Sequence, residues 1–392
     1  MLAKQPVRCQ PHQKGQFCFR TSPLDDAAPL RNDGEMRLED LGWDPVLAHH
    51  AEEAGDPSLM PGRLATVDRG RVVANTGTDV VQAAWRYPVP VVGDRSGVMP
   101  AVGDWAMITG TGELRRLVTL LPRRTLLARG FEGGGRLAQP LAANVDLVMV
   151  VTGLDGDFNL RRIERFLALA RAGSVRAIVV LSKSDLSEDS DQAVEQVRKA
   201  APGLEVITVS SVTGDGLPEL GTEIGYGQTV VVVGSSGVGK STLINHLLGS
   251  DRQRTGTVRE SDDRGRHITT RRELLQLPDG GLVIDTPGLR EVGVLADEAA
   301  VLAVFPEIAA LAGQCRFKDC LHTEEPGCAV QRAVQEGGID ADRLGGYHRL
   351  IREQVSAARR SSEHERRAHE RATIGHYRKN IRAALRLKGH ES

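Results

Sequence analysis

The sequence predicts a multidomain protein in which a small all-β barrel precedes an α/β domain with a mostly parallel sheet and a C-terminal region of short helices. The chain has 392 residues, which exceeds the roughly 100 to 200 residues of one ordinary domain. Short apolar runs broken by glycines indicate the barrel. Apolar runs that alternate with helical stretches indicate the α/β domain.

We expect four segments along the chain. Residues 1–57 form a mostly irregular extension with one short helix over Leu41 to Glu53, and residues 58–130 form the barrel. Residues 131–296 form the α/β domain, in which the run ELLQLPDGGLVID predicts a hairpin that adds one antiparallel strand. Residues 297–392 contain short helices, a cysteine cluster and a helical tail.

The composition is that of a soluble globular protein, because 40% of the residues are hydrophobic and 26% are charged. No apolar run approaches the ~18 residues of a membrane span, and the N-terminus lacks the apolar stretch of a signal peptide. We therefore expect a cytoplasmic protein that contacts no membrane and works as a monomer.

The net charge of −1 conceals two segments of opposite sign. Asp25 to Asp56 holds ten acidic residues against two arginines, whereas Arg343 to Lys388 holds thirteen lysines or arginines against four glutamates. Such a basic segment favours a polyanion partner. The alternative is a solvated helix supported by Arg–Glu pairs.

The barrel segment has the composition of an oligonucleotide-binding (OB) fold. It contains ten arginines against five acidic residues between Gly62 and Gly130, together with Trp85, Tyr87 and Trp105. Basic and aromatic side chains together are typical of a barrel that binds a nucleic acid strand. The alternative is a structural barrel whose aromatic residues fill its own core.

A phosphate-binding loop follows the strand-like run TVVVV. The sequence GSSGVGKS fits G-x-x-x-x-G-K-[ST] and precedes the helical run STLINHLL, which is the context that this motif requires. Backbone N–H groups of such a loop surround phosphate oxygens, Lys240 reaches the β and γ phosphates, and the Ser241 hydroxyl binds Mg²⁺. The alternative is a glycine-rich turn without a ligand. The predicted nucleotide contacts of this motif are Gly234, Ser235, Ser236, Gly237, Val238, Gly239, Lys240, Ser241 and Thr242.

A second phosphate-linked motif, Asp-Thr-Pro-Gly, follows the run LVI. Asp285 is expected to hold Mg²⁺ through water, and the Gly288 N–H is expected to meet the γ-phosphate. Together with the phosphate loop, this motif predicts a nucleoside triphosphatase.

Four residues predict that the base of the bound nucleotide is guanine. Ser182, Lys183, Ser184 and Asp185 resemble the N/T-K-x-D motif of GTPases. An Asp185 carboxylate accepts two hydrogen bonds from guanine, whereas adenine offers no such pair of donors. Ser210 and Ser211 resemble the loop whose N–H bonds the guanine O6. Ser182 replaces the usual Asn or Thr, so its hydrogen bond to the phosphate loop is an open question. An adenine-nucleotide kinase is the alternative that Lys183 and Asp185 oppose.

Three cysteines and one histidine predict a structural zinc site with a complete tetrahedral set of ligands. A closed site of this kind organises a loop-rich fold and takes no part in catalysis. The alternative, three free buried cysteines, fits poorly because the surrounding sequence is polar. The expected ligands of one Zn²⁺ per chain are Cys315, Cys320, His322 and Cys328.

The guanine motifs precede the phosphate loop, which is the reverse of the order in ordinary GTPases and indicates a circular permutation. With these elements the chain resembles the ribosome small subunit-dependent GTPase A family, from about Gly62 to the C-terminus. The resemblance implies an OB-type barrel, a permuted P-loop GTPase domain and a zinc module. It also implies a GTP hydrolase that binds the small ribosomal subunit and its rRNA, assists late subunit maturation and is stimulated by the subunit.

The resemblance also assigns a first switch to residues 265–270. It makes Thr269 the expected Mg²⁺ ligand, with Thr270 as the alternative. Leu289 stands where many GTPases carry a glutamine that orients the attacking water, and the family points to His267 for that role. An exposed histidine without a catalytic role is the alternative. A rival for the whole protein is a GTP-dependent RNA-binding switch with incidental hydrolysis.

Overall fold

The computed structural model describes residues 36–109, 115–129, 139–250, 272–285 and 298–356. They begin with a short 3-10 helix, Glu39–Leu41, and helix α1, Pro45–Glu53. The Asp44 side chain caps α1 by accepting a hydrogen bond from the Leu47 N–H at 2.9 Å. The expected helix therefore begins later than Leu41, because Asp44 caps its N-terminus and Pro45 occupies its first turn.

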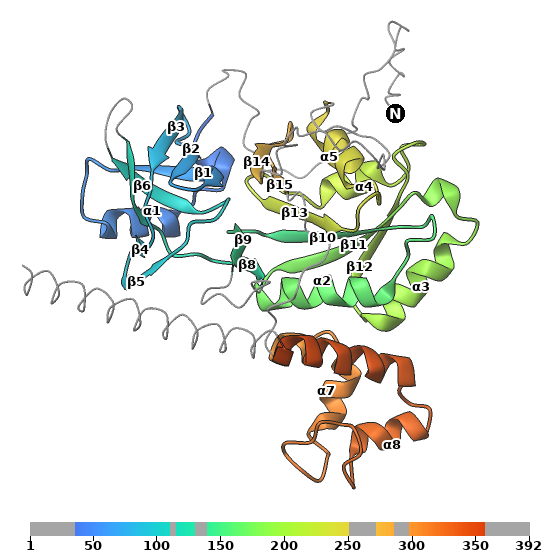
Figure 1. Cartoon of the computed structure of the whole chain (residues 1–392). Helices are drawn as coiled ribbons and strands as arrows, with labels where there is room; N and C mark the ends of the chain where they lie inside the picture. The colour runs from blue at the N-terminus through green and yellow to red at the C-terminus, as the bar shows by residue number, and fades with distance from the viewer. Residues whose placement is uncertain (1–35, 110–114, 130–138, 251–271, 286–297, 357–392) are drawn as a thin grey trace, which may run out of the picture. The chain divides into compact units, whose positions relative to one another are not determined.

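The barrel is closed (Figure 1). Its sheet has the order β3-β2-β1-β6-β7-β4-β5, and an additional pairing of Ala84 with Arg116 joins β3 to β7. Strands β1, β2, β3, β6 and β7 thus form a ring, and the β4–β5 hairpin extends from β7. The strands are β1 Met60–Asp68, β2 Arg71–Asn75, β3 Val80–Ala84, β4 Val89–Val91, β5 Asp94–Val98, β6 Trp105–Thr109 and β7 Arg116–Leu120.

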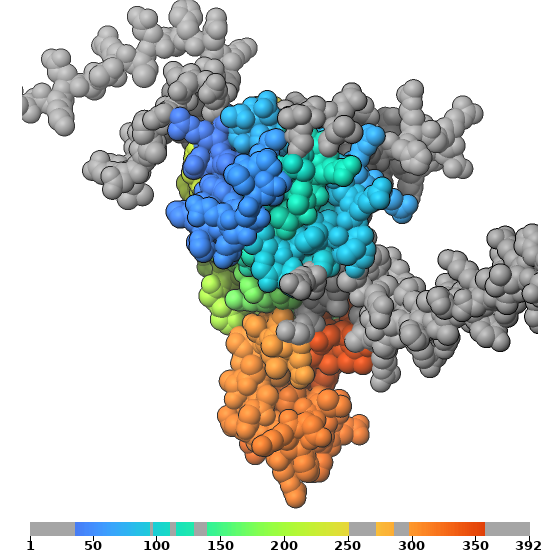
Figure 2. All heavy atoms as spheres, turned by 90° about the vertical axis from the view of Figure 1, so that its left-hand side faces the viewer, coloured from blue at the N-terminus to red at the C-terminus, as the bar shows by residue number. Residues whose placement is uncertain are grey.

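Small and branched apolar residues fill the barrel, among them Leu64, Val72 and Ile108. The three aromatic residues of this segment have different environments. Trp105 is fully buried, Trp85 is half-buried with its Nε1 donating to the Asp68 carbonyl at 2.8 Å, and Tyr87 is 52% exposed. Of these three residues, Tyr87 alone is largely exposed. Figure 2 shows the barrel surface in blue to cyan.

A two-stranded antiparallel sheet of β8, Leu126–Arg129, and β9, Gln139–Ala143, leads into the α/β domain. Its sheet has the order β12-β11-β10-β13-β15-β14, and all pairings are parallel except that of β14 with β15. The strands are β10 Leu147–Gly153, β11 Arg176–Ser182, β12 Glu205–Val209, β13 Thr229–Gly234, β14 Glu273–Gln276 and β15 Leu282–Asp285. The predicted hairpin is confirmed as β14 and β15.

Helices cover both faces of this sheet (Figure 1). Along β10, Val148 and Val150 belong to the core that helices α2 and α3 cover, whereas Met149 and Val151 belong to the core that α4 and α5 cover. This alternation follows from the two-residue period of a strand. The helices are α2 Leu160–Ala172, α3 Ser190–Ala200, α4 Leu217–Thr222 and α5 Lys240–Leu248.

The C-terminal region is helical, with α6 Glu298–Leu302, α7 Pro306–Ala312, α8 Ala329–Gln335 and a further helix over residues 341–356. Phe305 and Tyr347 pack edge to face at 5.7 Å within it. Among the described residues, no helix combines the length and the apolar character that crossing a membrane requires.

A buried arginine links the barrel to the α/β domain. Arg63 of β1 is 0% exposed and donates hydrogen bonds to the carbonyls of Leu41 and Asn144 and to the Thr229 hydroxyl. Burial lowers the pKa of Arg63 to about 10, which still leaves the guanidinium charged at neutral pH. Its carbon Cζ lies 5.4 Å from the centre of the Trp105 ring.

Replacing Arg63 with Ala should destabilise the protein by ~3 kcal/mol or more, because three buried oxygen atoms lose a charged donor. Urea unfolding followed by tryptophan fluorescence measures the loss. The control is Arg69→Ala, which removes an exposed arginine of the same barrel and should change stability by less than ~0.5 kcal/mol. Equal unfolding midpoints for the two variants would show that Arg63 is not a structural link.

Candidate functional site

The predicted nucleotide-binding motifs meet at one edge of the parallel sheet. Strands β10, β11, β12, β13 and β15 run in the same direction, so their carboxyl ends share this edge. The phosphate loop follows β13, the two guanine motifs follow β11 and β12, and Asp285 ends β15. Ligands of open α/β sheets bind at this edge.

Glycines give the phosphate loop its shape. Gly234 has a φ of 148°, and a Cβ added there would lie 2.2 Å from the Val151 carbonyl oxygen of the neighbouring strand. Gly239 has a φ of 92° and directly precedes the first residue of α5. The turn therefore requires glycine at both positions, and the buried Val238 side chain anchors the loop between them.

Lys240 lies over the phosphate loop. Its Nζ donates to the Gly234 carbonyl at 2.9 Å and to the Ser235 carbonyl. Ser241 and Thr242 follow in the first turn of α5, where both are half-buried and where the helix dipole is positive. A cationic side chain and a helix N-terminus at one loop favour an anionic ligand such as a phosphate group.

Ser182 answers the question that the sequence leaves open. Its side chain is buried, and its Oγ lies 2.7 Å from the Val238 carbonyl of the phosphate loop and 3.2 Å from the Thr152 carbonyl. The serine hydroxyl therefore makes the connection to the phosphate loop that is usual for Asn or Thr. Lys183 follows with a φ of 61°, and the Ser184 side chain is half-buried.

A hydrogen bond joins the two guanine motifs. The Ser210 Oγ donates to Asp185 Oδ1 at 2.5 Å and accepts the N–H groups of Val212 and Thr213 at 3.2 and 3.1 Å. The carbonyl of Ser211 lies 3.2 Å from a ring nitrogen of His246 on α5. Asp185 itself is exposed at the sheet edge, where a ligand can reach its carboxylate.

The loop between β10 and α2 contributes two acids that the sequence analysis missed. Asp155 forms an ion pair with Lys183, and this hydrogen bond lowers the pKa of Asp155. Asp157 holds Arg162, whose Nη1 lies 2.8 and 2.7 Å from the two carboxylate oxygens and also donates to the Ser235 Oγ. The signal was available, since acidic residues directly after a buried parallel strand lie at the ligand edge.

Five residues that the sequence analysis discussed for phosphate and water contacts lie outside the described residues. They are His267, Thr269, Thr270, Gly288 and Leu289. Asp285 is described and ends β15, half-buried and in register with Glu273 of β14. The structure thus brings together the phosphate loop, the guanine motifs and the strand that carries the acid.

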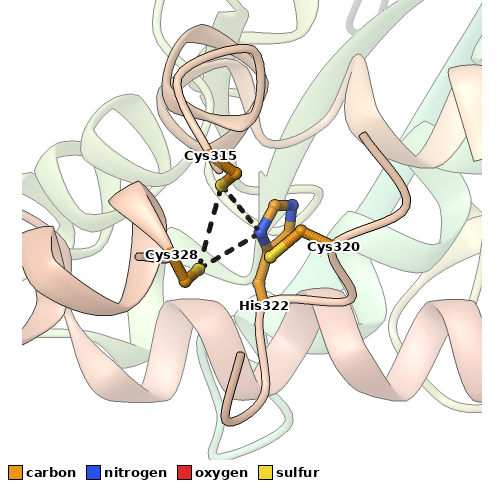
Figure 3. A group of neighbouring side chains, drawn as sticks. All are labelled: Cys315, Cys320, His322 and Cys328. Atoms are coloured by element: carbon orange, nitrogen blue, oxygen red, sulfur yellow. Dashed lines mark hydrogen bonds between the residues drawn. The ribbon is translucent and has the colours of Figure 1, made fainter. Parts of the chain in front are cut away.

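The four predicted zinc ligands form a cluster (Figure 3). Their ligand atoms all lie within 4.8 Å of one another. The His322 Nδ1 is 3.6 Å from the Cys315 sulfur and 3.5 Å from the Cys328 sulfur, and these two sulfurs are 3.9 Å apart. A tetrahedral zinc ion with ordinary bond lengths would separate sulfur from nitrogen by about 3.6 Å and sulfur from sulfur by about 3.8 Å.

Hydrogen bonds hold the ligand loop in shape. Gln331 donates from its side chain to the His322 carbonyl at 2.8 Å and from its backbone to the Cys328 sulfur at 3.4 Å. Glu325 accepts the N–H groups of Leu321 and Thr323, both at 2.9 Å, and these and other backbone hydrogen bonds lower the pKa of Glu325 to about 2. Such supporting contacts orient metal ligands.

Comparison with known proteins identifies the family. The family described as RsgA GTPase matches residues 120–295. A protein of Opitutus terrae described as small ribosomal subunit biogenesis GTPase RsgA is 46% identical over 336 residues, which cover 83% of this chain and 92% of that protein. The chain belongs to the RsgA GTPase family. A protein of Xanthomonas axonopodis pv. citri with the same description is 42% identical, over 82% of this chain and 86% of its own length.

Solved structures agree with this membership. YjeQ from Thermotoga maritima is 25% identical, with a TM-score of 0.55 over 76% of this chain and 99% of YjeQ. YloQ, described as a circularly permuted GTPase, shows the same fold at 23% identity, with a TM-score of 0.52 over 76% of this chain and 96% of YloQ. The predicted fold class, including the circular permutation, is confirmed, and the activity of an RsgA GTPase is hydrolysis of GTP.

The cysteine cluster should bind one zinc ion per chain, because its geometry fits zinc and a structural site of this kind adds to folding free energy. Metal analysis of the purified protein measures the zinc, and thermal unfolding measures its effect. Cys320→Ser should lose the metal and unfold at a lower temperature, whereas the control Cys18→Ser, which changes none of the four predicted ligands, should retain both the metal and the unfolding temperature. Absence of zinc from the parent protein would contradict the assignment.

Proposed function

We propose that this RsgA GTPase assists the late maturation of the small ribosomal subunit, and that the subunit stimulates its hydrolysis of GTP. The curated relatives are described as small ribosomal subunit biogenesis GTPases. One observation in this chain supports the GTPase part of the proposal most. The hydrogen bond from Ser182 to Val238 unites the guanine motif with the phosphate loop, so that one nucleotide can contact both.

In the proposed site, the backbone N–H groups of residues 234–239 surround the phosphates, and the Lys240 ammonium moves from the loop carbonyls to the β and γ oxygens. Ser241 and Asp285 are oxygen donors, which fit Mg²⁺. The ion would neutralise phosphate charge there. As the family resemblance and the Asp-Thr-Pro-Gly motif imply, Thr269 or Thr270 would complete the Mg²⁺ ligands, Gly288 would donate to the γ-phosphate and His267 would position the attacking water.

The guanine assignment depends on Asp185 and its neighbours. Ser210 holds one carboxylate oxygen of Asp185, which fixes the orientation of the group that would receive the two guanine donors. Asp155 holds the Lys183 ammonium group. The alkyl chain of Lys183 would pack over the base. The Ser211 N–H would donate to the guanine O6. These contacts favour GTP and GDP over adenine nucleotides.

The barrel offers a basic face for rRNA. Arg71 of β2 and Arg116 of β7 both pair with Ala84 of β3, so the three side chains point to the same outer side. All three residues are exposed, and exposed Arg86 and Tyr87 follow β3. Arginines on phosphates and an aromatic ring for base stacking are the usual components of a single-strand binding surface.

We propose that the four segments of the chain have different roles. Residues 58–130 bind rRNA, residues 131–296 hydrolyse GTP, and residues 297–392 carry the zinc ion and a basic tail, of which 357–392 lie outside the described residues. We propose no role for residues 1–57. The monomeric state and the cytoplasmic location stay predictions from the sequence.

The function is tested by measuring GTP turnover of the full chain while small ribosomal subunits are added. Turnover should rise with subunit concentration, and Lys240→Ala should abolish it. His267→Ala should lower stimulated kcat far more than GTP affinity, as expected for a residue that positions water. Binding of subunits without any change in turnover would support the rival, a GTP-dependent RNA-binding switch.

Asp185→Asn should weaken GTP binding by at least ~10-fold, because one acceptor for the guanine edge becomes a donor. The same change should improve binding of xanthine nucleotides, whose edge has the complementary pattern. Competition between labelled GDP and unlabelled xanthosine diphosphate measures both effects. If the variant binds GTP as tightly as the parent protein, the assignment of Asp185 to guanine is wrong.

Arg71→Ala combined with Arg116→Ala should weaken binding to the small subunit and reduce the slope of log affinity against log salt by about 1 for each lost phosphate contact. Sedimentation of the complex at several salt concentrations measures this. Arg198→Ala, which removes an exposed arginine of α3 in the GTPase domain, is the control. An unchanged slope in the double variant would place the rRNA contact elsewhere on the protein.

A further inference from the structure

One face of α2 is bound to the C-terminal region by three ion pairs. Arg161 pairs with Asp342 at 3.3 Å, Glu164 pairs with Arg343, and Arg165 pairs with Glu353 at 2.6 Å. The three α2 positions are spaced i, i+3 and i+4, so they lie on the same face of the helix. Their partners all belong to the helix over residues 341–356.

The middle pair is the most deeply placed of the three. The side chains of Glu164 and Arg343 are 8% and 12% exposed. Arg343 also donates to Glu307 at 2.6 Å and to the Val304 carbonyl at 2.7 Å, and its Cζ lies 4.2 Å from the centre of the Phe305 ring. Removing one partner of a buried pair is costly because the other charge remains buried. A displacement of α2 would therefore be transmitted to Arg343.

The same turn of α2 contacts the phosphate loop. Arg162 is next to Arg161 in the sequence, which turns its side chain by about 100° around the helix axis. Its guanidinium is held by both oxygens of Asp157 and donates to the Ser235 Oγ. The first two turns of α2 thus contact the phosphate loop on one side and the 341–356 helix on another.

We propose that Arg162 is a positioning residue for the phosphate loop, and that α2 couples the nucleotide bound at this loop to the docking of the 341–356 helix. The inference rests on the proposed role of the loop in binding phosphates. Bound phosphates draw the backbone N–H groups of the loop toward the ligand. The Ser235 side chain moves together with the backbone N–H of the same residue. Arg162 transfers that movement to α2, whose ion pairs with the 341–356 helix then strengthen or weaken.

Hydrogen exchange of the amides in residues 341–356 tests the coupling in the full chain. Affinity for GDP is measured first, because a parent protein that does not bind GDP contradicts the proposed function and not this inference. Binding of GDP should change the exchange rates of these amides by about fivefold or more. In Arg162→Ala the change should disappear at saturating GDP. The matched control is Arg171→Ala, an exposed arginine in the last turn of α2.

Reciprocity supplies a second measurement. Because coupling acts equally in both directions, weakening the 341–356 contact must also change GDP affinity, by a factor no larger than the one by which GDP changes docking. Arg165→Ala removes a half-buried pair and should produce that change, and combining it with Arg162→Ala should add nothing further. Ser235→Ala keeps the Arg162–Asp157 pair, so it tests the link if Arg162→Ala fails to fold. An exchange response to GDP that survives in both Arg162→Ala and Ser235→Ala would overturn the proposal.

Discussion

The buried guanidinium of Arg63 sets the main constraint on this structure. Taking a charged group out of water is expensive unless hydrogen bonds replace its hydration. Three acceptors from distant parts of the chain replace it here, namely the carbonyls of Leu41 and Asn144 and the hydroxyl of Thr229. Strand β1 of the barrel, the N-terminal 3-10 helix and the first residue of β13 therefore have to stay together. The phosphate loop begins at the other end of that same strand.

The shape of the phosphate loop and the clustering of the predicted zinc ligands could be predicted from the sequence, because each motif is short and its residues are close together in the chain. The glycines at 234 and 239 and the cysteines at 315 and 328 need only local folding to meet. The contact of Arg162 with the phosphate loop was missed for the opposite reason. Its partner Ser235 is 73 residues away, and no spacing rule connects a helix N-terminus to a loop on the neighbouring strand. Similarly, the barrel strands were recognisable as a group, but the register that places Arg71 and Arg116 beside Ala84 depends on closure of the ring.

Ser182 shows how a short side chain can preserve a contact that a longer one usually makes. A side-chain amide or a threonine hydroxyl usually connects the guanine motif to the phosphate loop, and here a serine hydroxyl at 2.7 Å does so. The smaller side chain suffices because β10 lies between β11 and β13, which brings Gly153 beside Ser182 and Val151 beside Gly234. The parallel register thus fixes the distance between the motifs, and the side chain only has to complete the contact.

The acceptors of Arg63 also determine when during synthesis the barrel can mature. Thr229 follows Arg63 by 166 residues. At the usual ~5 to 20 residues per second, a ribosome needs roughly ten to thirty seconds to add that length of chain. Once Leu120 at the end of β7 has been added, the barrel strands are complete, yet Arg63 still lacks Thr229. We therefore expect the Arg63 guanidinium of a nascent barrel to stay hydrated until the strand that leads into the phosphate loop has been synthesised.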